Sequence, residues 1–154
     1  MNHPYAAYQN AYQTVSKTRQ IVMLYEGTIR FLQQASDAMD NQRIEERYHL
    51  LVKASDVIVG LQSCLDFEAD EEVARTLFDF YSDIDMRIMQ LQRSNDKAEC
   101  EAIIDEIKGM RDIWKQIDET SQMTQPTPAS QPHGMNADPA PVSERAENGV
   151  FVSA

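Results

Sequence analysis

Residues 16–39 read SKTRQIVMLYEGTIRFLQQASDAM, and this stretch decides the fold. Its mostly apolar side chains recur at steps of three and four residues, the spacing of one face of an α-helix. That face consists of Ile21, Leu24, Tyr25, Thr28, Phe31, Leu32, Ala35, Ala38 and Met39. Ser16 or Thr18 precedes it and is able to cap the first free N–H groups. We therefore predict one long amphipathic helix over residues 18–40.

The same spacing recurs in three later segments, residues 44–67, 71–93 and 96–120. Their inward-facing residues are Leu51, Ala54, Ile58, Leu61 and Leu65 flanked by Leu50, Val57 and Cys64; then Ala74, Leu77, Tyr81, Ile84, Ile88 and Leu91; then Cys100, Ile103, Ile107, Met110, Trp114 and Ile117. Asp96 with Glu99 matches an acidic form of the capping box at the last helix start. Four such helices joined by short turns predict an all-α, antiparallel up-down four-helix bundle over residues 17–121.

The two ends of the chain differ from this body. Residues 1–16 form a Tyr-rich N-terminal arm without a helical stripe of its own. From Gln122 onward Pro, Ser, Gln and small polar residues dominate, so we expect a disordered tail over residues 122–154. Val150-Phe151-Val152 within this tail is either a short docking motif or without function.

Charge and cysteine content narrow the classes of function. The 25 acidic and 14 basic residues give a net charge of −11, which disfavours binding to nucleic acid or to an anionic membrane. The longest apolar runs are only about five residues, too short to span a bilayer, and the N-terminus lacks the pattern of a secretory signal. Cys64 and Cys100 have no CxxC spacing and both fall on predicted buried faces, as expected for reduced thiols in a cytoplasmic protein.

A metal site in the bundle has little support. Residues 46–49 form a Glu-x-x-His, half of the ligand set of a di-iron carboxylate bundle. The other histidines, His3 and His133, lie in the arm and the tail. We therefore expect no metal and no cofactor, and no residue pattern indicates a catalytic site.

Histidine phosphotransfer is the alternative function. His49 with Lys53 one turn later could carry a phosphoryl group. The phosphotransfer family, however, places its Lys three residues after the His, where this chain has Val52. A solvated surface histidine is the simpler interpretation.

Surplus apolar residues lie outside the predicted core. On helix 44–67 a stripe roughly 150° from the core face, at 100° per residue, contains Tyr48, Val52, Ser55, Val59, Gln62 and Asp66. On helix 71–93 a stripe about 110° from the core face contains Phe78, Ser82, Asp85 and Met89. These stripes are scattered surface residues, a surface for dimerisation, or a groove that accepts an amphipathic helix of a partner.

Several short motifs, in order, resemble the FliS family of flagellin-specific export chaperones. They are the arm sequence Pro4-Tyr5-Ala6-Ala7-Tyr8; residues 23–29, Met-Leu-Tyr-Glu-Gly-Thr-Ile, where the family has Met-Leu-Tyr-Asp-Gly-Ala-Ile; and Leu65-Asp66, Ala74, Leu77, Tyr81 and Trp114. The resemblance runs from about residue 4 to residue 117. The family often has a Gly-Gly pair after its Leu-Asp and a Pro at the first helix start, and this chain has neither.

The resemblance implies a cytoplasmic chaperone, not an enzyme, that binds the C-terminal segment of flagellin, prevents its premature polymerisation and keeps it export-competent. The arm would lie near an apolar pocket, as a lid or as part of the site. The residues expected to bind the client are Tyr5, Tyr8, Val22, Tyr25, Ile29, Tyr48, Val52, Val59, Asp66, Phe78, Asp85 and Met89. The export apparatus or another flagellar regulator is a further candidate partner, and the client-free protein would be a monomer or a weak dimer.

Overall fold

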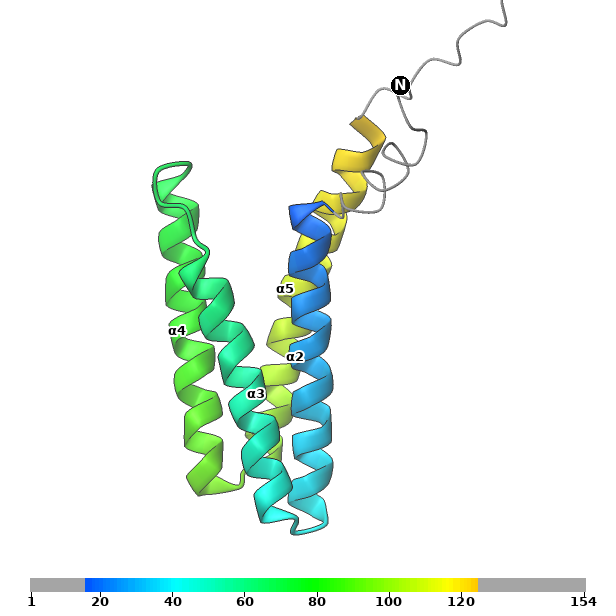
Figure 1. The fold of residues 1–154 in the computed structure, drawn as a ribbon, viewed down its shortest axis with the longest axis vertical. Coiled ribbons are helices and arrows are strands. Elements are labelled where there is room, and N and C mark those ends of the chain that lie inside the picture. The colour runs from blue at the N-terminus through cyan, green and yellow to red at the C-terminus, as the bar shows by residue number, and fades with distance from the viewer. Residues whose placement is uncertain (1–15, 125–154) are drawn as a thin grey trace, which may run out of the picture.

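The computed structural model describes residues 16–124, which form an antiparallel bundle of four helices and so confirm the predicted fold class (Figure 1). The helices are α2 (Lys17–Asp40), α3 (Ile44–Ser63), α4 (Glu71–Ser94) and α5 (Lys97–Thr124). Consecutive helices pack against each other, and α2 also packs along α5. Short turns between long helices leave only this up-down arrangement.

Polar side chains set the helix starts. Ser16 caps α2, because its Oγ accepts a hydrogen bond of 3.1 Å from the Arg19 N–H. Asp70 caps α4 in the same way, and Asp96 accepts from the Glu99 N–H at 3.1 Å before α5. Only the Asp96 half of the predicted capping box forms, because the Glu99 carboxylate accepts a hydrogen bond from Arg87 instead.

Helix α3 is shorter than predicted and ends at Ser63 instead of residue 67. The Asp66 carboxylate accepts hydrogen bonds from the backbone N–H groups of Glu68 and Ala69 and so offers the chain a turn in place of a further helical turn. Cys64, predicted on the buried face, is consequently exposed at the helix end. The other cysteine, Cys100, is buried as predicted.

Helix α5 is longer than predicted and includes residues 122–124, which the sequence had assigned to the tail. The change of composition at Gln122 does not stop a helix, since none of these three residues breaks one. The first proline is Pro126, and proline disfavours helical geometry in the residue before it.

The core draws on all four helices and largely matches the predicted faces. Two predicted core residues, Leu24 and Ile117, are 44% and 43% exposed. Both lie in the half of the bundle where α2 begins and α5 ends. There the α3–α4 pair separates from the α2–α5 pair (Figure 1), so neither residue has a full set of neighbours.

An arginine joins α4 to α5, which touch each other much less than the other packed pairs do. Arg87 on α4 donates to Glu99 at 2.6 Å and to Glu106 at 2.9 and 3.0 Å, both on α5, and to Asp83 at 3.1 Å. Its side chain is only 18% exposed. These hydrogen bonds, led by those to Glu106 and Glu99, raise the pKa of the guanidinium.

Replacing Arg87 by Ala should destabilise the bundle by about 1–3 kcal/mol, because three carboxylates lose a partly buried partner. Arg87→Lys should recover part of the loss, since it keeps the charge but not the two parallel hydrogen bonds to Glu106. Urea unfolding followed by circular dichroism measures both changes. Equal stability of the wild-type protein and Arg87→Ala would contradict a linking role.

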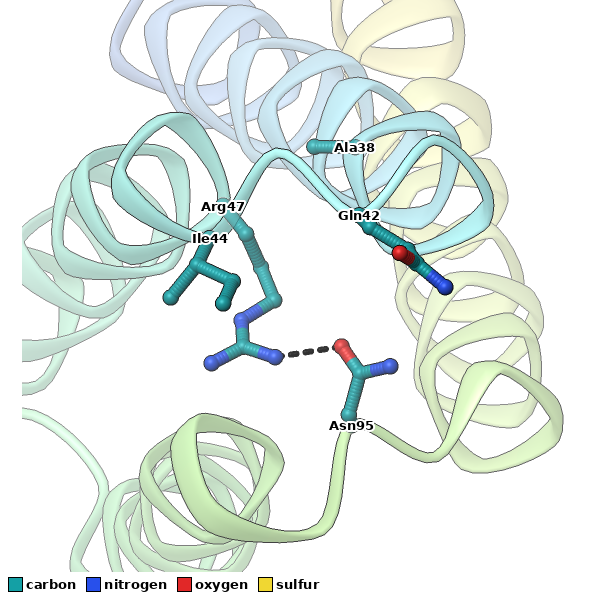
Figure 2. Close-up of a pocket in the computed structure, with 5 residues that line it drawn as sticks. All are labelled: Ala38, Gln42, Ile44, Arg47 and Asn95. Carbon is teal, nitrogen blue, oxygen red and sulfur yellow. Dashed lines mark hydrogen bonds between the residues drawn. The ribbon is translucent and has the colours of Figure 1, made fainter.

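At the end of the bundle that holds the α4–α5 turn, Arg47 links α3 to the end of α4. Its guanidinium donates to the side chain of Asn95 (Figure 2). It also donates to the backbone carbonyl of Gln92 at 3.1 Å and so caps the end of α4. Arg47 also lines an open cavity of about 330 Å³, together with Ala38, Gln42, Ile44 and Asn95. Since Arg47 already serves α4, we assign this end a structural role.

Asp118 ties the start of α2 to α5. Its carboxylate accepts from the Ser16 hydroxyl at 2.5 Å and from the Thr18 hydroxyl at 2.6 Å. These two hydrogen bonds, the one from Ser16 first, hold the pKa of Asp118 below its ordinary value of 3.8. The tie holds the beginning of α2 beside α5.

The same tie predicts a pH dependence. A carboxyl group whose pKa is lowered by folding stabilises the protein above about pH 4, and this contribution is lost as the pH falls through the lowered pKa. Asp118→Asn should remove that contribution, so the stability difference from the wild-type protein should shrink on acidification. Urea midpoints measured from neutral pH to about pH 3 test this. Glu119→Gln, at an exposed neighbouring position, is the control. Its stability difference from the wild-type protein should stay the same over this pH range.

Candidate functional site

The two surplus stripes predicted from the sequence meet along one line, where α3 packs on α4. Ser55 on α3 donates to Asp85 on α4, and Gln62 donates to the Ser82 hydroxyl at 2.7 Å. Further along, Gln92 on α4 donates to the backbone carbonyl of Tyr48 at 3.1 Å. We call this line, with the stripe residues on both sides, the α3–α4 seam.

Apolar side chains flank the hydrogen bonds of the seam. Val59 is 46% exposed and Phe78 is 42% exposed, and Tyr48 and Met89 are exposed as well. Val52 is half-buried. The seam also includes Phe67, whose ring contacts Phe78 edge-on at 6.2 Å between centroids. The sequence had assigned Phe67 only to the end of a helix; its spacing from Phe78 becomes visible once the α3–α4 turn is built.

The two acidic residues expected at this site already have partners. Asp85 accepts from Ser55, and Asp66 accepts from the N–H groups of the turn that follows it, at 2.9 and 3.2 Å. Both carboxylates thus hold the seam and the turn in shape. A ligand on the seam would contact mainly the apolar side chains that lie between these two carboxylates.

The α2 residues expected to bind a client are not surface residues. Tyr25 is fully buried, and Val22 and Ile29 are buried as well. Val22, Ile29 and Ser36 share one side of α2 at steps of seven residues, and Ser36 lines a hollow together with residues of α5. The expectation is corrected for these three side chains, because the packed helices bury them. The periodicity had already placed Tyr25 on the apolar face of α2 and had left out only Val22 and Ile29. Tyr5 and Tyr8 lie outside the described residues.

An apolar hollow lies at the end of the bundle where the α3–α4 pair separates from the α2–α5 pair. This open-end cavity has a volume of about 260 Å³. Its lining comes from all four helices and the α3–α4 turn, namely Ile21, Leu61, Cys64, Leu65, Asp66, Ala69, Asp70, Val73, Ala74, Leu77, Tyr81 and Trp114. The sequence assigned Leu65, Leu77 and Trp114 to a closed core and so missed the cavity.

Tyr81, which lines this cavity, is paired with the buried Tyr25 behind it. The Tyr25 and Tyr81 hydroxyls lie 2.5 Å apart and link α2 to α4. Burial raises the pKa of both phenols, and the hydrogen bond from the Trp114 side chain opposes the rise at Tyr25. Both phenols stay neutral at physiological pH, so the pair carries no charge.

The titratable side chains of residues 16–124 indicate no reaction. His49 is exposed and has Glu45 at 3.9 Å, an acid that would repel a phosphoryl group. Burial, with smaller contributions from Glu101 and Glu99, raises the pKa of the Cys100 thiol to about 11, which makes it unreactive. Within the described range no cluster of three or more His, Cys, Asp or Glu residues is placed to hold a metal ion.

Comparison with known proteins decides the family. The family model described as Flagellar protein FliS matches residues 1–121. The chain belongs to the FliS family. The Flagellar secretion chaperone FliS of Campylobacter jejuni is 29% identical over 125 residues, which cover 80% of this chain and 98% of the relative. The protein of the same name in Bacillus subtilis is 28% identical over 117 residues, covering 75% and 86%.

A solved structure shows the same fold as this FliS-family chain. A protein described as a flagellar chaperone from bacteria superposes with a TM-score of 0.65 at 16% identity, covering 77% of this chain and 99% of the other. Membership in this family places the chain among the chaperones of flagellum biogenesis, which is not an enzyme class. None of the helices within residues 16–124 has the length and apolar character needed to cross a bilayer.

Proposed function

We propose that this protein is a cytoplasmic export chaperone that binds the C-terminal segment of flagellin. In this role it keeps flagellin from polymerising before export. The observation that carries the proposal is the α3–α4 seam, on which both stripes face solvent side by side. Val59 and Phe78 are its central exposed residues.

The seam has the features of a surface for an amphipathic helix. Apolar side chains at steps of three and four residues suit anchors on a partner helix, and Met89 and the aromatic rings adapt to different anchor shapes. Between them, Ser55 is hydrogen-bonded to Asp85 and Gln62 to Ser82, so a partner covering these pairs would not separate them from water without a bond of their own. Burial of apolar surface would then provide most of the affinity.

We place the client-binding surface on Tyr48, Val52, Val59, Asp66, Phe78, Asp85 and Met89, extended by Phe67. The arm residues Tyr5 and Tyr8 remain part of the proposal as a lid or as a second contact. Val22, Tyr25 and Ile29 are no longer included, because the bundle buries them.

Titration with the flagellin C-terminal segment tests the function. Calorimetry should show one-to-one binding with a negative heat-capacity change, the sign expected for apolar burial. Absence of binding at high micromolar concentration would refute the proposal. Mass measurement at two protein concentrations, with and without the segment, separates this function from a bundle that only dimerises through the seam.

A further inference from the structure

The lining of the open-end cavity is mostly apolar and is suited to an apolar occupant. Asp66 uses its carboxylate for the turn behind it. Asp70 accepts from the Val73 N–H at 3.1 Å as the cap of α4. One oxygen of each carboxylate is thus engaged, while Leu65, Val73 and Trp114 offer apolar surface. An aromatic hydrocarbon side chain would bury this surface without leaving a hydroxyl unpaired.

The chain itself leaves the bundle beside this cavity. Trp114 lines the cavity, and α5 continues past it to Thr124. Ten residues of helix span about 15 Å, so residue 125 starts within roughly that distance of the cavity. Figure 1 shows this end of α5 where the helix pairs are apart.

One short segment beyond Thr124 has the required chemistry. Phe151 is the only aromatic residue among residues 125–154, and it stands between Val150 and Val152. We propose that Val150-Phe151-Val152 docks in the open-end cavity of the same chain, with Phe151 as its anchor. The family model ends at residue 121, so the segment is an addition to the matched region. The inference goes beyond the proposed function and does not depend on the identity of the client.

The intervening chain has a suitable length. About 26 residues separate Thr124 from Phe151, and a flexible chain of that length has a root-mean-square span of about 28 Å. The cavity lies well within this reach. A tether of this kind keeps its end at a local concentration on the order of millimolar, so a contact too weak to join separate molecules is populated within one chain.

Disulfide trapping tests the inference, because the cavity contains the exposed thiol of Cys64 while Cys100 is buried. In the full chain, Val152→Cys keeps Phe151 and places a thiol next to it. With a mild oxidant, this variant should form an intramolecular disulfide with Cys64, seen as a loss of two hydrogen atoms in the intact mass. The rate should exceed that of Val142→Cys by at least about fivefold, although the shorter loop alone would favour residue 142 by about twofold.

Three matched variants make the result decisive. Adding Phe151→Ala to Val152→Cys should abolish the advantage over Val142→Cys, and adding Cys64→Ser should abolish the disulfide. A rate for Val152→Cys no higher than for Val142→Cys, or unchanged by Phe151→Ala, would overturn the inference. A disulfide between two copies of the chain would also overturn it. Faster disulfide formation by Tyr8→Cys than by Val152→Cys would overturn it as well, because the arm would then be the occupant.

Fluorescence supplies a second readout without new thiols. Trp114 is the single tryptophan of the chain and lines the cavity. Phe151→Ala should shift its emission to longer wavelength, because water replaces the aromatic ring, whereas Val142→Ala should not. Identical spectra for wild type and Phe151→Ala would count against docking.

Discussion

Joint replacement of Val59 and Phe78 by Asp is expected to lower the affinity for the flagellin C-terminal segment by at least about tenfold, or about 1.4 kcal/mol. The two side chains face solvent on opposite sides of the α3–α4 seam. A client helix lying on the seam would bury the two new carboxylates without partners, which is unfavourable. Calorimetric titration of the variant against the wild-type protein measures the loss.

The design allows folding and binding to be separated. Both positions are more than 40% exposed in the free protein, so the helical circular dichroism signal and the urea midpoint should change little. Met23→Asp is the matched control, since Met23 is an exposed apolar residue on the solvent side of α2, away from the seam. Full affinity in the double variant would show that the client binds elsewhere on the bundle.

A large effect on stability is expected at the buried Tyr25–Tyr81 pair. Tyr25→Phe should cost about 1–3 kcal/mol, because it leaves the buried Tyr81 hydroxyl without its partner. Tyr81→Phe should cost a similar amount, since it leaves the buried Tyr25 hydroxyl without its partner. Urea unfolding of both single variants and of the double variant provides the measurement.

The double variant is the sharper test of this pair. When both hydroxyls are absent, neither is left without its partner, so the double variant should be no less stable than either single variant. The coupling between the two sites should therefore be clearly non-additive. Simple addition of the two single losses would mean that the hydroxyls do not depend on each other.

The helices and their inward faces were largely predictable from the sequence. The step of three and four residues places Leu32, Ile58, Ile84 and Ile103 on faces that the bundle buries. Ser16 was a recognisable cap because its side chain acts on the residues directly after it. Such features depend on neighbours along the chain, and local sequence contains them.

The sequence did not predict in this way which residues at the edges of each apolar face are buried. Ile29 was expected to bind the client and is buried in the core, whereas Ile117 was expected in the core and is 43% exposed. Periodicity gives the direction of the apolar face, but the width of the buried part depends on how many helices surround it. Here α2 has close neighbours on two sides, while α4 diverges from α5.

The sequence by itself thus determined four amphipathic helices, their order and the two surplus stripes, because hydrophobic periodicity and capping are local properties. Only the tertiary structure decided that the stripes of α3 and α4 meet along one seam, joined by Ser55–Asp85 and Gln62–Ser82. It also decided that the bundle opens beside Trp114 and Cys64. The physical reason is that both features depend on the separation between helices, and this is set by the packing of all four helices together.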